Sequence, residues 1–280
     1  MNARHVLATQ RRFLSTMSFR FFLVLLLAVP AAAKFAPPSF VDERGLSDAE
    51  RYQRCLDETR SDASTAYEQA LAWHDAGGGA AAVHCSALAL VQLKQYAEAA
   101  FKLDQLAHSP ESGEAGLRAE LLDQAGNAWM LAGQSRNAEA ALSAAIDLDP
   151  SADSFGDRAR ARAQARNWTG AETDLGVALS KDPFRADFLV LRASARHALG
   201  KKKEARDDIE QALRIDPHYA DALVERGGMK LEEGDRAGAR ADWQIVLATQ
   251  PKSAAADSAR ARIEALELRK PRRAHRSTRP

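Results

Sequence analysis

The stretch ADFLVLRASARHALGKKKEARDDIEQALRIDP, residues 186–217, contains the pattern from which the fold can be inferred. Two amphipathic segments flank Gly200, and Pro217 closes the second one. The motif that ends the second segment recurs before and after this stretch at a nearly constant interval. Its closing prolines are Pro150, Pro183, Pro217 and Pro251, and they end the phrases AAIDLDP, VALSKDP, QALRIDP and IVLATQP. A period of about 34 residues predicts a repeat protein in which each unit is one supersecondary element.

Small residues recur at two fixed places inside each unit. The set nearer to the closing proline, always at the same distance from it, is Ala138, Ala171, Ala205 and Ala239. The set twice as far from that proline is Gly126, Ala159, Ala193 and Gly227. Between the two segments stand Gly133, Gly200 and Gly234, with Arg166 in the second unit. A small residue midway along each helix allows close approach, and proline stops the second helix. The sequence therefore predicts stacked antiparallel helix hairpins.

This pattern resembles the tetratricopeptide repeat, and four consecutive units satisfy it: 119–151, 152–185, 186–219 and 220–253. The resemblance implies an all-α, right-handed superhelical solenoid of antiparallel helix hairpins. We expect divergent hairpins and a loop over 46–118, the four regular units over 119–253, and a capping helix over 254–269. Outside this array we expect a signal peptide (1–33), a linker (34–45) and a basic disordered tail (270–280).

Charged residues repeat in register with the hairpins. Three arginines and three aspartates, with the same offset from each arginine to its aspartate, are Arg158, Asp174, Arg192, Asp208, Arg226 and Asp242. Both places are alanine, Ala125 and Ala141, in the preceding unit. Because the bases and acids appear together, we interpret them as a structural ladder of Arg–carboxylate pairs rather than an anion-binding stripe.

The resemblance also implies a binding surface, because first helices of such arrays line a concave groove for partner segments. The groove positions carried over to this sequence are Glu120, Asp123, Asn127, Met130, Arg160, Asp187, Val190, His197, Asp221, Val224 and Glu225. They suggest an acidic rim over an apolar floor, which suits a basic or amphipathic segment. The alternative is a solvated face without a dedicated ligand.

The charge distribution argues against nucleic acid as a partner. The chain has 39 basic and 38 acidic residues, but residues 1–33 and 269–280 together hold ten of the bases and none of the acids. The body from 34 to 268 therefore carries a formal charge of −9, which disfavours binding to phosphate backbones.

No pattern typical of catalysis stands out. His74 and His84 flank the glycines 77–79, but their spacing is looser than that of metal-binding motifs. We therefore expect no enzyme activity, no cofactor, no metal site and no small-molecule substrate.

The N-terminus has the three parts of an export signal. Arg20 precedes the apolar run FFLVLLLAV, and small residues at Ala31 and Ala33 fit a cleavage site. The run is shorter than the roughly 20 residues of a membrane-spanning helix. We expect a periplasmic or secreted protein cleaved near Ala33, with an uncleaved inner-membrane anchor as the alternative; translation starts at Met1 or Met17.

The two cysteines, Cys55 and Cys85, fall on neighbouring predicted helices. In an oxidising compartment they can form a disulfide, whereas two buried free thiols are equally consistent with the sequence.

Taken together, these features indicate a non-enzymatic scaffold in the cell envelope that binds a protein partner in its concave groove. The rival interpretation is a protein that binds an anionic membrane surface or polymer through residues 270–280, which carry five bases and no acid.

Overall fold

The computed structural model describes residues 45–268, which fold into thirteen α-helices and one 3-10 turn. The predicted signal peptide, residues 34–44 of the linker, and residues 269–280 lie outside the described residues. In chain order the elements are α3 (Asp48–Ser61), α4 (Ala63–Asp75), α5 (Gly79–Gln92), α6 (Tyr96–His108), η1 (Pro110–Ser112), α7 (Ala115–Leu131), α8 (Ser135–Leu148), α9 (Ala152–Gln164), α10 (Trp168–Lys181), α11 (Ala186–Ala198), α12 (Lys202–Ile215), α13 (Ala220–Glu232), α14 (Arg236–Thr249) and α15 (Ala254–Leu268).

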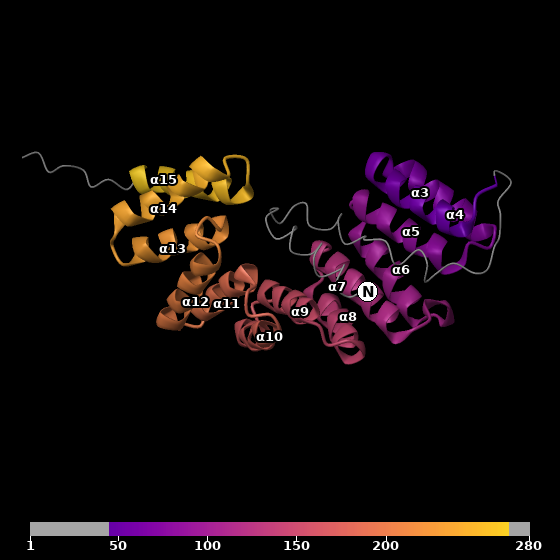
Figure 1. Cartoon of the computed structure of the whole chain (residues 1–280), viewed down its shortest axis with the longest axis horizontal. Coiled ribbons are helices and arrows are strands. Elements are labelled where there is room, and N and C mark those ends of the chain that lie inside the picture. The colour runs from indigo at the N-terminus through magenta and orange to yellow at the C-terminus, as the bar shows by residue number, and fades with distance from the viewer. Residues whose placement is uncertain (1–44, 269–280) are drawn as a thin grey trace, which may run out of the picture.

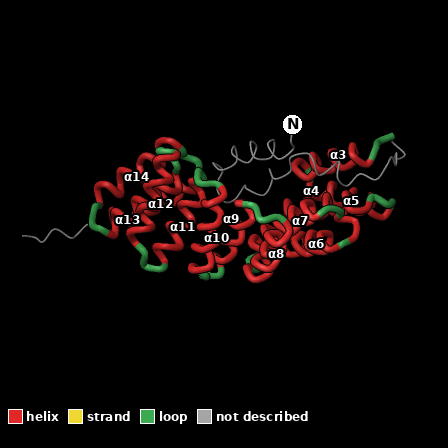
Figure 2. Tube along the Cα trace, turned by 60° about the horizontal axis from the view of Figure 1, so that its bottom comes forward, coloured by secondary structure: helices red, strands yellow, loops and turns green. Residues whose placement is uncertain are grey.

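The helices follow one another as stacked hairpins in an elongated, curved array. Figure 1 shows the curvature: α3–α4 and α14–α15 form the two ends, and α8 to α10 lie at the bottom of the bend. Figure 2 shows the same succession along the long axis, with loops between the helices. From α7 onward each first helix contacts the next one, through α9, α11 and α13 to α15. These helices therefore form the inner, concave layer of a superhelical solenoid.

The small residues fit the hairpins as the spacing requires. A Cβ atom on Gly126 would lie 2.4 Å from Cγ of Leu142, and one on Gly227 would lie 2.4 Å from Nε1 of Trp243. In both units a large, fully buried side chain of the second helix fills the space that glycine leaves on the first. Ala205, at the other small position of the third unit, is likewise fully buried.

The turns between paired helices require a left-handed backbone. Gly200 has φ 78°, and its counterpart Arg166 has φ 60°. A non-glycine residue adopts this conformation only at a cost in free energy, so the second unit tolerates some strain at this turn.

The first regular unit differs from its expected bounds. Its first helix begins at Ala115 instead of residue 119, and η1 occupies part of the expected loop. At the other end, α15 covers the last hairpin through Ala256, Ala259 and Leu266, which are almost fully buried. Within residues 45–268, no helix is long and apolar enough to cross a membrane.

The N-terminal hairpin is attached to the next one by a disulfide. Cys55 on α3 is bonded to Cys85 on α5, with their Cα atoms 6.3 Å apart. Beside it, the buried imidazole of His84 shares hydrogen bonds with the Tyr52 hydroxyl and with Gln124 on α7. The divergent hairpins are thus held by a covalent link and by polar contacts as well as apolar packing.

Candidate functional site

The predicted Arg–Asp partners lie between the two helices of each hairpin. Nε of Arg158 donates to Oδ2 of Asp174 at 2.9 Å and Nη2 donates to Oδ1 at 2.8 Å. The same two-bond geometry joins Arg192 to Asp208 and Arg226 to Asp242. Because the aspartate side chains are only 3% exposed, these pairs belong to the packing between helices.

Each of these aspartates accepts a second cation from one turn further along the first helix. Arg162 reaches Asp174 at 2.8 Å, Arg196 reaches Asp208 at 2.7 Å, and Lys230 reaches Asp242 at 2.9 Å. Arg162 also pairs with Glu139 on α8, as Arg196 does with Glu172 on α10. The ladder therefore links neighbouring hairpins and leaves its cations engaged within the chain.

The pKa shifts in the ladder follow from these contacts. Burial by itself would raise the pKa of Asp242, but hydrogen bonds from Arg226 and Lys230 outweigh burial and lower it. The hydrogen bonds with Asp242 raise the pKa of Arg226. Both partners consequently stay charged at neutral pH.

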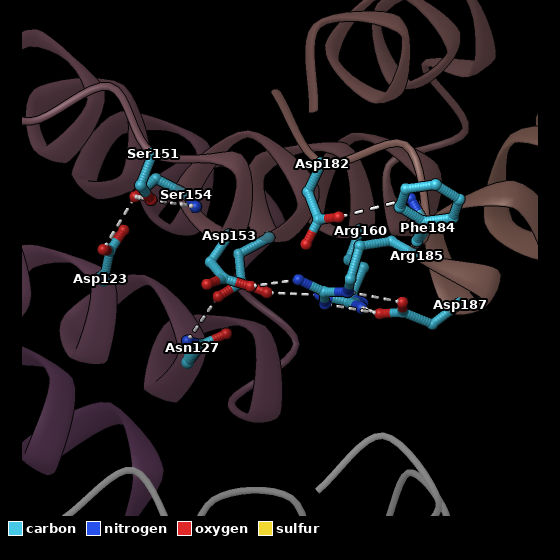
Figure 3. A network of polar contacts seen from close by, with 11 residues as sticks. Asp123, Asn127, Ser151, Asp153, Ser154, Arg160, Asp182, Phe184, Arg185 and Asp187 are labelled. Carbon is cyan, nitrogen blue, oxygen red and sulfur yellow. Dashed lines mark hydrogen bonds and ion pairs between the residues drawn. The ribbon is translucent and has the colours of Figure 1, made fainter. Parts of the chain in front are cut away.

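On the concave side, a second polar network connects α7 with α9 (Figure 3). Ser154 donates to Oδ2 of Asp123 at 2.9 Å, and Nδ2 of Asn127 donates to Oδ2 of Asp157 at 3.0 Å. Two of the predicted groove residues, Asp123 and Asn127, thus contact the neighbouring first helix.

The network continues to α11 through two arginines that converge on Asp187 (Figure 3). Arg160 pairs with Asp187 at 3.0 Å and also with Asp157, while Arg185 pairs with Asp187 at 2.8 Å and with Asp153 at 2.6 Å. Burial would lower the pKa of Arg185, but Asp187 and Asp153 raise it overall.

An aromatic ring supports the two guanidinium groups. The Cζ atoms of Arg185 and Arg160 lie 3.8 Å and 5.4 Å from the ring centroid of Phe188. A Cβ on Gly156 would approach Cε1 of that ring to 2.3 Å, so only glycine leaves room for it. Packing and charge together fix this part of the concave face.

Further along, α13 carries two carboxylates one turn apart, Asp221 and Glu225. Glu225 pairs with Arg262 of α15 at 3.4 Å, whereas the carboxylate of Asp221 makes no hydrogen bond or ion pair with any residue from 45 to 268. Desolvation by the surrounding protein, followed by the charges of Glu225 and Asp187, raises the pKa of Asp221, although the residue is exposed. Negative charge at this position is therefore incompletely compensated.

The structure corrects the expectation of an apolar groove floor. Val190 and Val224 are 9% and 5% exposed and belong to the core. Each first helix packs against the neighbouring first helices, and both valines belong to the core cluster that runs through the last hairpins. The concave face is accordingly polar at the positions between the helices.

The remaining predicted groove residues are spread along the array. Met130 is half-buried against the cluster of Ala138, Leu142 and Ala161, and His197 pairs with Glu232 at 3.1 Å. Glu120 lies on α7, and burial, followed by the charge of Glu120, raises the pKa of Tyr52 on α3. These residues do not join the network around Asp187.

The histidines flanking the glycines 77–79 are not brought together for metal binding. His84 is buried, whereas His74 is exposed on α4. No group of three or more metal-ligating side chains occurs in the part of the chain that the structure describes.

Arg185 and Asp157 were missed by reasoning from the sequence. Arg185 precedes α11 in the phrase DPFRAD, where the next unit has Tyr219 in DPHYAD. Arg185 therefore stands at the repeat position of Tyr219, two residues before Asp187. An arginine in place of an aromatic residue, so close to an aspartate, is the sequence signal that could have revealed this ion pair.

Comparisons with known proteins agree with this architecture. The family model of the tetratricopeptide repeat matches residues 186–219. PilF of Pseudomonas aeruginosa superposes with a TM-score of 0.58 at 14% identity, over 77% of this chain and 97% of that one. MamA from Desulfovibrio magneticus gives 0.53 at 16% identity, over 62% and 97% of the two chains. At these identities the likeness is one of fold. No curated protein matches the chain.

Proposed function

We propose that this chain, a tetratricopeptide repeat protein, is a non-catalytic scaffold of the cell envelope that binds a basic or amphipathic segment of a partner protein on its concave face. The repeat fold supports an interaction role in general terms, since its stacked hairpins present an extended concave surface. The partner's chemistry is inferred from the charges on that surface.

The observation that carries this proposal is the set of carboxylates on α11 and α13. Asp187 is compensated by Arg160 and Arg185, and Glu225 is partly compensated by Arg262. Asp221 lies near both and has no cation of its own among residues 45–268. A lysine or arginine of a partner would relieve this repulsion, so electrostatic complementarity favours a cationic segment there.

Affinity capture from an envelope extract tests the proposal. The baits are residues 34–280 and a variant with Asp221→Lys and Glu225→Lys. Asp187 is left unchanged because reversing it would break the contacts of two arginines. The control, Glu204→Lys with Asp207→Lys on the exposed side of α12, makes the same change in net charge.

We expect the unmodified bait and the control to retain the same partner and the α13 variant to lose it. Circular dichroism confirms that all three baits are equally folded. Equal capture by all three would contradict binding at α13.

We propose export on two grounds: the signal-like N-terminus and the disulfide Cys55–Cys85, which is typical of oxidising compartments. N-terminal sequencing of the protein from fractionated cells tests this. A start at Lys34 supports cleavage, a retained N-terminus in the membrane fraction supports the anchored form, and a cytoplasmic protein with reduced cysteines contradicts export.

A further inference from the structure

We infer that the concave face of α13 is a docking surface for the chain's own residues 269–280, which compete there with the partner segment. This inference rests on the proposed function and adds a regulatory occupant to the same surface.

The last helix already places a guanidinium group on this face. Arg262 on α15 approaches Glu225, and its Nη1 would lie 2.7 Å from a Cβ on Gly228. The absence of a side chain at Gly228 therefore makes room for an arginine supplied by the C-terminal part of the chain. Asp221, one turn before Glu225 on the same helix, has no such partner among the described residues.

The end of α15 is fixed beside the start of α14, at the end of the last hairpin away from Asp221. Nη2 of Arg236 donates to the carbonyl oxygen of Leu266 at 2.6 Å, and Arg240 pairs with Glu267 at 3.0 Å. Both arginines belong to the first turns of α14, the helix paired with α13. The chain consequently leaves α15 beside the last hairpin.

The segment that follows is complementary in charge. Its six bases, without any acid, are Arg269, Lys270, Arg272, Arg273, Arg276 and Arg279. When docked, this cationic segment would meet a helix face on which Asp221 and Glu225 are spaced by one turn.

The segment is long enough to reach the whole face. Twelve extended residues span about 40 Å, whereas the thirteen residues of α13 extend over about 20 Å. Because the segment is tethered, its local concentration at α13 is on the order of millimolar, so weak contacts suffice for substantial occupancy. A partner has to displace it, and salt weakens both interactions.

Fluorescence polarisation with a labelled amphipathic Lys/Leu peptide tests the competition. The proteins are residues 34–280, residues 34–268, and each of these with Asp221→Asn; Asp207→Asn on α12 is the matched control. We expect residues 34–268 to bind the peptide about tenfold more tightly than residues 34–280 at low salt. Asp221→Asn should weaken binding to residues 34–268, and Asp207→Asn should not.

The outcomes separate this inference from the proposed function. If both lengths bind the peptide equally and Asp221→Asn weakens both, the binding surface stands and the docking of residues 269–280 is wrong. If neither length binds, the proposed function fails as well.

Vesicles containing phosphatidylglycerol provide a second readout for the same segment. Docking predicts that Asp221→Asn releases residues 269–280 and increases vesicle binding by residues 34–280. Vesicle binding that is strong and unchanged by Asp221→Asn would overturn docking in favour of a membrane-binding tail.

Discussion

Arg192 and Asp208 meet through two hydrogen bonds, from Nε to Oδ2 at 3.0 Å and from Nη2 to Oδ1 at 2.7 Å. Arg196 adds a third contact to the same carboxylate, whose side chain is 3% exposed. A buried ion pair of this kind contributes little net free energy compared with apolar packing, because both charges lose hydration. Removing one member is costly, since the other charge stays buried without compensation.

The first prediction concerns this pair. Asp208→Ala should lower the free energy of unfolding by about 3 kcal/mol, because Arg192 and Arg196 lose their common carboxylate. Urea denaturation followed by circular dichroism measures the loss. The adjacent Asp207→Ala is the control: its side chain is 63% exposed, and we expect a change within about 0.5 kcal/mol. Equal effects of the two substitutions would contradict a structural ladder.

The second prediction concerns the disulfide. Replacing Cys55 and Cys85 by alanine opens a loop with a sequence separation of 30 residues. The chain-entropy model assigns a loop of this size about 3 to 4 kcal/mol. We expect a loss of this order in the free energy of unfolding of the N-terminal hairpins.

Removing the disulfide should destabilise the hairpins that it joins and not the rest of the array. In stacked repeats each unit contacts only its neighbours, so hydrogen exchange should accelerate in α3 to α5 and stay unchanged in α11 to α15. Uniform acceleration along the chain would show that the array unfolds as one cooperative unit. Treating the unmodified protein with a reductant under mild denaturation should reproduce the pattern of the alanine variant.

Reasoning from the sequence recovered the hairpins and the ladder because both depend on local rules. Period, small residues and turns specify each hairpin separately, and a constant offset along the chain joins Arg192 to Asp208 within one hairpin. The concave face depends instead on how neighbouring hairpins stack. Val190 was therefore expected in the groove and lies in the core, while Arg185 was overlooked although it contacts residues of two units.

The third prediction concerns pH. Burial lowers the pKa of His84 to about 4, against a hydrogen bond with Gln124 that raises it. Since the unfolded chain has the ordinary value near 6.5, it binds a proton between pH 6.5 and 4 while the folded protein does not. The stability associated with neutral His84 is thus complete above pH 6.5 and declines on acidification.

A substitution isolates this contribution from the other titrating groups. His84→Gln keeps a donor and an acceptor for Tyr52 and Gln124 but removes the proton equilibrium. Between pH 7 and pH 4 the unmodified protein should lose about 3 kcal/mol more than the variant. Parallel pH dependences of the two proteins, measured by denaturant unfolding, would show that His84 does not titrate in this way.

The fourth prediction pairs two helical glycines for which adding the same methyl group should have opposite effects. A Cβ at Gly156 would meet the Phe188 ring at 2.3 Å, so Gly156→Ala should displace the ring beneath Arg160 and Arg185 and destabilise the protein by about 1 to 3 kcal/mol. At Gly176, within α10, a Cβ meets nothing within 4 Å. Gly176→Ala should therefore stabilise the protein by about 0.5 to 1 kcal/mol through reduced backbone entropy in the unfolded chain.

Thermal unfolding of the Gly156→Ala and Gly176→Ala variants measures the sign of each effect. A stable Gly156→Ala protein would mean that Phe188 adopts another rotamer. If this variant then bound the Lys/Leu peptide more weakly while Gly176→Ala did not, the Phe188 ring would be shown to position the concave face.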